Sequence, residues 1–281
     1  MIDIAVIPVA GRGINLLPLT KSQPKEMLPV ANKPVVQYVV EEMIHCRLER
    51  ILFITGSDKS AIENHFDINE ELIWHLRRTG KEDLLQALAF ERAKARYFYT
   101  RQRHHSGLGH AVLCAESFVQ GNCFVTALGD TILGREQSSD IVRQMIDLFE
   151  KNSREVSGVI AFDNVPLQEV VHYGVAKPKA AGRIFEIEDI VEKPDIDNAP
   201  GTLIVAARYV FSPEIFDFLH RTEPDAYDTV QLTDAIRLML QSGKKFLGVQ
   251  IPSGERRYDI GNLESYYKAF LDFASFRQGL L

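Results

Sequence analysis

The chain has 281 residues, of which 46% are hydrophobic and 25% charged, a profile typical of a globular protein that buries a sizeable core. Its 32 Lys and Arg against 38 Asp and Glu leave a net charge of −6, which argues against a general nucleic-acid-binding protein. The sequence contains no run of 18 apolar residues and no basic signal-like segment at its start, so we expect neither a membrane span nor export. An anionic ligand would therefore need positive charge that is concentrated locally.

The three cysteines, Cys46, Cys114 and Cys123, cannot all pair with one another and show no Cys-x-x-Cys spacing. Reduced and mostly buried thiols are the simplest interpretation, and they are typical of a reducing compartment. We therefore expect a cytoplasmic protein without zinc or disulfides. The eight histidines also lack metal-binding spacing, and we interpret His104-His105 as an exposed loop pair.

Strands and helices alternate through the first half of the chain. A buried strand over Ile4–Val9 runs into the glycine loop 10–13, and four prolines exclude a regular helix between Gly13 and Lys33. After that loop the pattern predicts a helix from Pro34, a strand over Arg50–Thr55, a polar helical region to Lys94, a strand over Arg96–Arg101, a helix from Gly109, a strand over Cys123–Leu128 and a helix over Ser139–Lys151. This alternation predicts a Rossmann-like, doubly wound α/β sheet with its ligand outside the carboxyl ends of the strands.

The second half is richer in strands and ends in a helix. Strands are predicted over Val156–Phe162, Gly174–Ala176, Arg183–Val191, Leu203–Phe211 and Phe246–Ile251, with helices over Pro213–His220 and Gln231–Gln241. The chain shows no flexible linker, so we expect one domain, 1–281, made of a doubly wound part (1–155), a strand-rich part (156–261) and a C-terminal helix (262–281). The sheet as a whole is then mixed.

The C-terminal helix has an apolar face. Helical spacing places Leu263, Tyr266, Tyr267, Phe270, Leu271 and Ala274 on that face. Two interpretations remain open: the face packs against its own domain, or it contributes to a dimer interface.

The loop that follows the first strand carries the clearest chemical signal. Gly11 and Gly13 would let backbone N–H groups approach a phosphate, although two such glycines could also make only a tight turn. The spacing is neither a Walker loop nor the dinucleotide-binding fingerprint, because Leu16 stands where a third glycine belongs. The segment from Arg12 to Lys33 has a charge of +3 in an otherwise acidic chain, and Lys25 is fixed between Pro24 and an apolar run. An anion site is therefore predicted here.

Motifs along nearly the whole chain resemble one family. They are Ala-Gly-x-Gly at 10–13, Leu-Pro-x-Thr-Lys at 17–21, Pro-Lys-Glu-Met-Leu-Pro at 24–29, Arg-Gln at 101–102, Gly-Leu-Gly-His-Ala at 107–111, Leu-Gly-Asp at 128–130, Val-Glu-Lys-Pro at 191–194, Arg-Tyr-Val at 208–210, Gln-Leu-Thr-Asp-Ala at 231–235 and Tyr-Asp-Ile-Gly at 258–261. In this order they resemble the bacterial UTP–glucose-1-phosphate uridylyltransferases, or UDP-glucose pyrophosphorylases, of the sugar-nucleotidyltransferase superfamily. The resemblance implies the Rossmann-like nucleotidyltransferase fold, with a nucleotide-binding half at 1–155 and a sugar-binding half at 156–261.

The resemblance also implies a reaction. A phosphate oxygen of glucose 1-phosphate attacks the α-phosphorus of UTP, and UDP-glucose and pyrophosphate form. The attacking oxygen is already anionic, so the protein needs no general base and must instead align and neutralise two anions. The resemblance implies Mg²⁺ as cofactor, UTP and glucose 1-phosphate as partners rather than nucleic acid or membrane, and a homodimer or homotetramer.

Site residues follow from the resemblance, motif by motif. Asp130 and Asp259 correspond to the Mg²⁺-binding pair, although each could also serve only as a turn or capping residue. Lys25 and Lys193 correspond to the cations that face the phosphates, and Glu192 and Gly174 to the residues at the hexose. Ala10, Gly11, Gly13, Gln102 and Gly107 correspond to nucleotide-binding positions, with Gln102 reading the uracil edge unless it is only a loop residue.

The first loop departs from the family pattern. Ile14-Asn15 replaces the usual Thr-Arg pair, Asn32 replaces an Asp and Ile260 a Cys, and the missing arginine removes a charge from the triphosphate site. We hypothesise that Arg12 partly replaces that charge and count it among the catalytic residues. Two functional alternatives remain: a catalytically weak regulatory homologue, or a nucleotidyltransferase that uses another nucleotide or sugar 1-phosphate.

Overall fold

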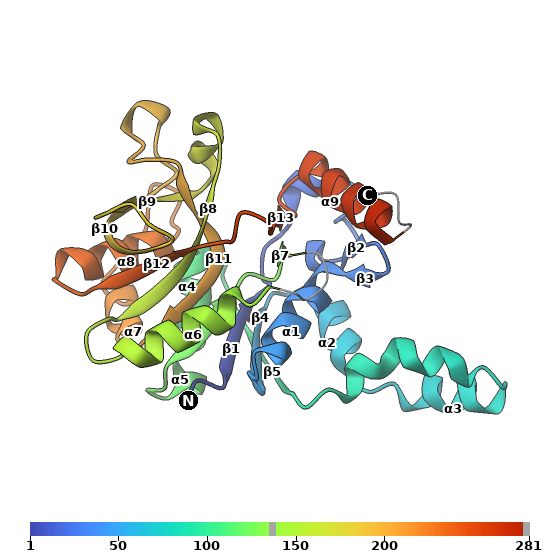
Figure 1. Cartoon of the computed structure of the whole chain (residues 1–281). Coiled ribbons are helices and arrows are strands. Elements are labelled where there is room, and N and C mark those ends of the chain that lie inside the picture. Colours follow the sequence, from blue (N-terminus) through green and yellow to red (C-terminus); the bar gives the residue numbers. More distant parts are fainter. Residues whose placement is uncertain (135–138, 278–281) are drawn as a thin grey trace.

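A nine-stranded mixed sheet forms the centre of the molecule (Figure 1). The computed structural model describes residues 1–134 and 139–277. In spatial order the strands are β5 (Arg96–Arg101), β4 (Arg50–Thr55), β1 (Ile4–Pro8), β6 (Phe124–Ala127), β11 (Leu203–Phe211), β8 (Gly158–Asn164), β12 (Phe246–Gln250), β10 (Ile184–Glu192) and β9 (Gly174–Pro178). The doubly wound mixed sheet predicted from the sequence is therefore confirmed.

Strands β5, β4, β1 and β6 are parallel and form the first half of this sheet. Their apolar, β-branched runs have no polar alternation because helices cover both faces, and all the side chains of Ile51–Thr55 are buried. The chain leaves β1 toward β4 and later returns on the other side of β1 with β6, so the carboxyl ends of β1 and β6 border a topological switch point. A ligand site is expected at this edge.

Helices cover the two faces of the sheet. One face carries α1 (Val35–His45), α2 (Ser60–Phe66) and α6 (Ile141–Asn152), and the other carries α4 (Gly107–Leu113), α5 (Glu116–Val119), α7 (Ile215–Leu219) and α8 (Leu232–Gln241). Helix α1 begins directly after Pro34 and buries its apolar stripe Val36, Val39, Val40 and Met43. The resulting three layers bury two separate hydrophobic clusters, one on each face of the sheet.

The polar segment between β4 and β5 contains α2, α3 (Glu70–Arg78) and the 3₁₀ segment η3 (Glu82–Arg92), and α3 projects from the body in Figure 1. The remaining 3₁₀ turns are η1 (Ile14–Leu16), η2 (Lys25–Met27), η4 (Leu167–His172) and η5 (Ile196–Asn198). No long helix forms between Gly13 and Lys33, as the prolines predicted.

Strand β11 runs antiparallel to both β6 and β8, and its pairing with β8 shifts register between Val205 and Tyr209. Ala207 adopts φ 60° within this irregularity, which is rare for a residue with a Cβ. The shift puts Ala207 and Tyr209 on the cavity side, while Arg208 points away into the interior. The irregular strand thereby joins the two halves of the site.

Two short ladders lie beside the main sheet. Strand β2 (Pro29–Val30) pairs with β3 (Lys33–Pro34), and β7 (Thr131–Leu133) pairs antiparallel with β13 (Arg257–Asp259). The second ladder brings a segment from near the end of the chain next to the segment after β6. This ladder therefore serves mainly to position residues of the site, because Thr131 and Asp259 both line the cavity.

The C-terminal helix α9 (Leu263–Arg277) lies beside β2 and contacts β13, away from the N-terminus (Figure 1). Its packed face is Tyr266, Ala269 and Phe273, and the Phe273 ring meets Tyr38 and Tyr258 edge-on. Only part of the predicted apolar face packs against its own domain, since Tyr267, Phe270 and Leu271 are exposed. Aromatic contacts with Tyr38 and Tyr258, which periodicity does not reveal, select a different stripe. Residues 278–281 of the predicted helix lie outside the described residues.

Within residues 1–134 and 139–277, the helices are all too short or too polar to cross a membrane. The three cysteines are free thiols, and Cys46 is buried. Burial raises the pKa of Cys46 to about 12, with Glu42 adding to the shift. This thiol is accordingly unreactive.

Candidate active site

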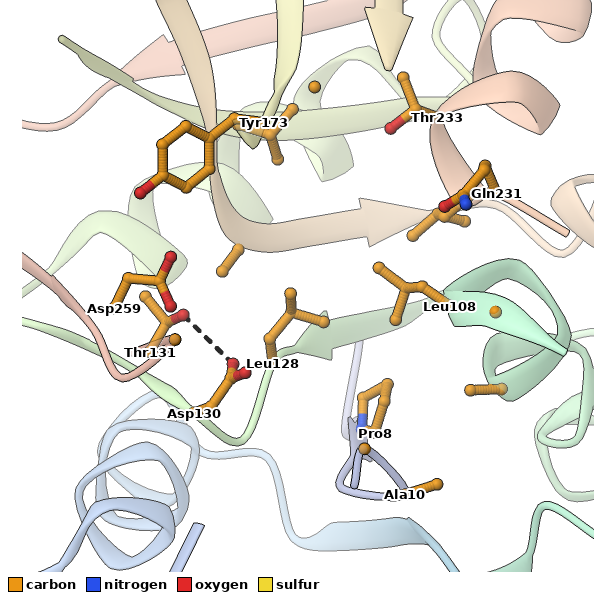
Figure 2. A pocket seen from close by; sticks show the side chains of 18 of the residues that line it. Pro8, Ala10, Leu108, Leu128, Asp130, Thr131, Tyr173, Gln231, Thr233 and Asp259 are labelled. Carbon is orange, nitrogen blue, oxygen red and sulfur yellow. Dashed lines mark hydrogen bonds between the residues drawn. The ribbon is translucent and has the colours of Figure 1, made fainter. Parts of the chain in front are cut away.

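A cavity of about 600 Å³ lies at the carboxyl ends of β1 and β6 and is lined by both halves of the chain (Figure 2). Pro8 and Ala10 line one side of it, and Gln231 and Thr233 lie on the opposite side in Figure 2. Eleven of the twelve predicted site residues line this cavity: Ala10, Gly11, Arg12, Lys25, Gln102, Gly107, Asp130, Gly174, Glu192, Lys193 and Asp259. The fold therefore gathers residues from seven separate motifs, together with Gly174, in one place.

Gly13 is the predicted residue that does not line the cavity. It adopts φ 66°, and a Cβ there would lie 3.0 Å from the Thr20 methyl and 3.1 Å from Lys25 Cβ. The Thr20 hydroxyl donates to the Gly13 carbonyl at 2.7 Å. Gly13 thus makes the tight turn that folds the loop back on Lys25, which is the structural alternative to direct phosphate contact.

A buried ion pair between Lys59 and Glu26 holds the first loop in place. Lys59 Nζ donates to the Gly11 carbonyl at 2.7 Å and to Glu26 Oε2 at 2.7 Å. Both side chains are almost completely buried. Burial raises the pKa of Glu26, although the charges of Lys59 and Lys25 oppose this shift. Gly11 is therefore held in place by a network that includes Glu26, the glutamate of the Pro-Lys-Glu motif.

Lys25 crosses the floor of the cavity and donates a hydrogen bond to Asp130 Oδ2. Burial alone would lower the pKa of Lys25, but Asp130 and then Glu26 raise it above its ordinary value. Burial likewise opposes ionisation of Asp130, and the Lys25 charge nevertheless keeps the pKa of that carboxyl lowered. Lys25 is thus a permanent cation, and Asp130 a permanent anion, at neutral pH.

The β7–β13 ladder sets Asp259 beside Asp130. Asp259 pairs with Thr131 in the register, and the Ile260 N–H donates to the Asp130 carbonyl at 2.9 Å. Burial and then the Asp130 charge raise the pKa of Asp259, while Arg257 opposes them from 3.4 Å. Figure 2 shows the two carboxylates at the same end of the cavity. Two buried acids that repel one another are expected where a cation belongs.

The donor set at this point fits a divalent metal such as Mg²⁺. Two carboxylates on a rigid ladder supply hard oxygen ligands, and Mg²⁺ takes the remainder of its shell from waters and phosphate oxygens. Among the described residues no group of three or more His, Cys, Asp or Glu side chains could hold a metal alone, so the rest of the shell must come from elsewhere. Asp130 and Asp259 suit a metal that arrives with a phosphorylated ligand.

Glu192 and Gly174 form a polar corner on the opposite side of the cavity. Thr233 Oγ1 donates to Glu192 Oε2 at 2.7 Å, and burial raises the pKa of Glu192 although Thr233 opposes this. A Cβ at Gly174 would lie 3.0 Å from Thr233 Oγ1 and 3.3 Å from Glu192 Oε2. Gly174 therefore keeps open the space in front of two groups that can bind hydroxyls.

Lys193 follows Glu192 in the left-handed conformation, with φ 42°. Its ammonium lies 3.8 Å from Glu192 Oε1, and 57% of its side chain is exposed. A non-glycine residue holds such a backbone only where its surroundings impose it, and here the Lys193 N–H donates to the Tyr173 carbonyl at 2.9 Å. The backbone is fixed and the ammonium is free to move.

Gln102 and Gly107 line a third part of the cavity. Gln102 is buried, and its amide nitrogen donates to the Gly107 carbonyl at 3.0 Å and contacts His110 Nδ1 at 3.0 Å. Gly107 has φ 89°, and a Cβ there would lie 2.5 Å from the Val230 carbonyl. The glycine is required by backbone packing, while Gln102 has its carbonyl oxygen available as an acceptor.

Several supporting residues escaped the sequence analysis. Arg208 is fully buried and bonds Glu42 Oε2 at 2.6 Å and the Thr131 carbonyl at 2.9 Å, which ties β11 and α1 to the residue after Asp130. Lys59 was not recognised because it follows a strand in a polar segment, although β4 ends at the same sheet edge as β1. His105 is exposed as predicted, yet it also lines the cavity.

Comparison with known proteins agrees with this geometry. The model of the nucleotidyl transferase family matches residues 4–275. The chain belongs to this family. A curated UTP–glucose-1-phosphate uridylyltransferase from Staphylococcus epidermidis is 40% identical over 271 residues, which cover 96% of this chain and 91% of the relative.

Solved structures extend the likeness to the whole fold. A UDP-glucose pyrophosphorylase in complex with UDP-glucose superposes with a TM-score of 0.87 at 34% identity and covers 99% of this chain and 100% of its own. A UTP-bound enzyme from Acinetobacter baumannii gives a TM-score of 0.87 at 34% identity and covers 100% and 99%. The nucleotidyltransferase architecture, including the C-terminal helix, is shared along the full length.

Proposed function

We propose that this chain transfers a uridylyl group from UTP to glucose 1-phosphate and releases pyrophosphate. The observation that carries the proposal is the single cavity in which the Lys25–Asp130–Asp259 cluster stands between the first loop and the Glu192–Lys193 corner. The curated relative bears this activity in its name, and the solved relatives hold UTP and UDP-glucose. Both lines of support point to the same pair of substrates.

The reaction balances without a protein base. A phosphate oxygen of glucose 1-phosphate forms a bond to the α-phosphorus, and the bond from that phosphorus to the oxygen bridging the β-phosphate breaks. The leaving pyrophosphate keeps the electron pair. Since the nucleophile is already anionic, the residues have to bring two anions together and compensate the charge that shifts to the leaving group.

Each side chain then has a role that its environment favours. Lys25, buried and permanently charged, faces the phosphates of the nucleotide, while Lys193 follows the sugar phosphate from the other side. Glu192 and Thr233 accept or donate hydrogen bonds to sugar hydroxyls, and the carbonyl oxygen of Gln102 accepts from the base. Ala10 and Gly11 present their backbone to the triphosphate.

We further propose Mg²⁺ as the cofactor, held by Asp130 and Asp259. When bound, it would supply positive charge that offsets the charge of the phosphates. Lys25 already pairs with Asp130, and Arg257 lies 3.4 Å from Asp259, so the protein itself offsets part of the negative charge of the two carboxylates. This assignment predicts that Asp259→Asn weakens metal binding more than it weakens folding.

We also propose that the enzyme acts in the cytoplasm as a homodimer or homotetramer. The exposed Tyr267, Phe270 and Leu271 on α9 are the apolar residues that such an interface would cover. Light scattering of the purified chain, with Leu271→Lys as the variant, measures the mass directly. A monomeric wild-type protein would contradict the oligomer.

The function is tested by pyrophosphate release with Mg²⁺ over a matrix of UTP, dTTP, CTP and GTP against several sugar 1-phosphates. We expect turnover to be highest with UTP and glucose 1-phosphate. Turnover with dTTP alone would overturn the uridylyl assignment. Tight UDP-glucose binding without turnover in any combination would show a regulatory homologue instead.

A further inference from the structure

Two side chains from separate loops meet at one rim of the cavity. Arg12 follows β1, His105 follows β5, and both line the cavity with their side chains exposed to solvent. Gly56, at the end of the intervening β4, brings these loops together, because a Cβ there would lie 3.3 Å from the Ala10 carbonyl and 3.5 Å from His105 Cε1. The order β5-β4-β1 in the sheet makes this meeting a consequence of the fold.

These two residues differ from the two lysines and the other arginine that line the cavity. Lys25 is bonded to Asp130, Lys193 lies 3.8 Å from Glu192, and Arg257 lies 3.4 Å from Asp259. Within residues 1–134 and 139–277, Arg12 and His105 make no ion pair and no side-chain hydrogen bond. At the rim, Arg12 therefore carries a positive charge that no carboxylate of the described residues pairs with. His105 can add a second charge if it takes up a proton.

The groups that face His105 come from all the neighbouring loops. They are Arg12 after β1, and Asp58 and Lys59 after β4, with the Lys59 charge already compensated by Glu26. Partial burial, then Arg12 and Lys59, lower the pKa of His105, and Asp58 opposes them. The imidazole is consequently neutral at neutral pH until an anion arrives at the rim.

We propose that Arg12 and His105 together bind the terminal phosphates of the nucleoside triphosphate, and that His105 takes up a proton from solvent as this polyanion binds. The inference rests on the proposed function, since it assumes a triphosphate in the cavity. In this proposal, Arg12 and His105 together supply the positive charge that an arginine at position 15 would have supplied. Asn15, which also lines the cavity, can add a hydrogen bond but no charge.

The sign of the pH dependence follows from the direction of the linkage. A polyanion favours the charged imidazole and so raises its pKa in the complex above that of the free protein. Affinity for the triphosphate therefore rises as the pH falls through the pKa of the complex, and it levels off below the pKa of the free protein. Protonation of the UTP γ-phosphate occurs equally with any variant and cancels in a comparison.

Calorimetry of UTP binding in the presence of Mg²⁺ and without glucose 1-phosphate tests the proposal. Titrations in buffers of different ionisation enthalpy give the number of protons taken up. We expect His105→Gln to lose the proton uptake and to bind UTP about 3- to 10-fold more weakly at pH 6.5, with less than about a twofold change at pH 8.5. His105→Lys, a permanent cation, should keep the affinity and lose the proton uptake.

Two controls separate this role from a structural one. His104→Gln changes the neighbouring exposed histidine, which does not line the cavity, and should bind UTP like the wild type. UDP-glucose has no terminal phosphate, so its affinity should be the same for wild type and His105→Gln. An equal loss of affinity for UDP-glucose, or an unchanged proton uptake in His105→Gln, would overturn the proposal.

The two proposals fail in distinguishable ways. A wild-type enzyme that releases pyrophosphate from UTP and glucose 1-phosphate, while His105→Gln shows the same pH dependence of UTP affinity, rejects only the rim. A protein that binds UTP with His105-dependent proton uptake but turns over no sugar phosphate supports the rim and rejects the uridylyltransferase. A wild-type protein that binds no nucleoside triphosphate rejects both.

Discussion

The two sides of the cavity hold their lysines in different ways. Lys25, on the side of the first loop, has 18% of its side chain exposed and bonds a carboxylate that is itself almost enclosed. Lys193, on the opposite side, has 57% exposed and only a 3.8 Å contact with Glu192. In the proposed reaction, the phosphates thus meet a paired, largely enclosed cation on one side and a more exposed one on the other.

This difference matches what each side has to do. A buried, paired cation is fixed before the ligand arrives, so its position needs no reorganisation when charge shifts to the leaving group. An exposed lysine keeps its rotamer freedom and can follow a phosphate that moves during the reaction. The first loop is therefore the scaffold of the site, and the Glu192–Lys193 corner is its adjustable part.

The largest expected effect comes from breaking the fully buried Arg208–Glu42 ion pair, which supports the segment after Asp130. Arg208→Met removes the partner of the buried Glu42 and should lower the free energy of unfolding by about 3–5 kcal/mol. Glu42 Oε1 already lacks a hydrogen-bond partner among the described residues, so the double variant with Glu42→Leu should recover much of the loss. Denaturant unfolding measures both.

A matched control for Arg208 is Arg237→Met, which breaks the half-exposed pair with Asp189. This change should cost less than about 1 kcal/mol, because water replaces the lost partner. Equal destabilisation by Arg208→Met and Arg237→Met would show that burial does not distinguish the two regions.

Lys25→Met should have the next largest effect, on catalysis. Removal of one preorganised cation is expected to lower kcat/KM by about 10²- to 10³-fold, and it leaves Asp130 and Asp259 to repel one another. Pyrophosphate release measures the rate, with the exposed Lys21→Met as the control that should retain it. A kcat/KM within tenfold of the wild-type value would show that Lys25 is not a catalytic residue.

Lys193→Ala tests the adjustable side. We expect the KM for glucose 1-phosphate to rise by about tenfold, in line with the loss of one exposed charge-assisted contact, and the unfolding midpoint to stay the same. The KM for UTP should change little. A larger rise in the KM for UTP than in the KM for glucose 1-phosphate would show that Lys193 contacts the nucleotide and not the sugar phosphate.

Gly174→Ala should give the smallest effect. The added methyl would lie 3.0 Å from Thr233 Oγ1 and 3.3 Å from Glu192 Oε2, close enough to displace a sugar hydroxyl. We expect a roughly threefold higher KM for glucose 1-phosphate with little change for UTP. Gly254→Ala, which meets no atom within 4 Å, is the control, and identical kinetics for both variants would show that the corner does not contact the sugar.

The sequence predicted the parts of this protein that depend on local patterns. The strands Arg50–Thr55, Arg96–Arg101 and Leu203–Phe211 appear with the predicted bounds, since continuous apolar or β-branched runs are read without knowledge of their partners. Asp130 was found through the resemblance of its Leu-Gly-Asp motif, and its place after a strand agrees with a site at the carboxyl edge of the sheet. The gathering of motifs in one cavity required the fold, and the roles of its residues remain predictions.

Long-range polar pairs were beyond the sequence. Glu42 and Arg208 stand 166 positions apart, and Glu26 and Lys59 stand 33 apart, so each charge looks like an ordinary solvated side chain by itself. Which residues of α9 pack against the domain was also beyond the sequence, because Tyr38 and Tyr258, far along the chain, select Phe273. Charge and periodicity in the sequence identify candidate ion-pair partners and candidate buried residues, and the packing of the folded chain determines which of them are in contact.

The β7–β13 ladder also bears on the order in which the enzyme is made. Asp130 leaves the ribosome long before Asp259, and the ladder that joins their segments has only three residue pairs. Closing such a distant contact is slow compared with forming the local βαβ units that precede it. A nascent chain can therefore complete the sheet around β1 while Asp130 still lacks its neighbour Asp259, so the two carboxylates come together only late in synthesis.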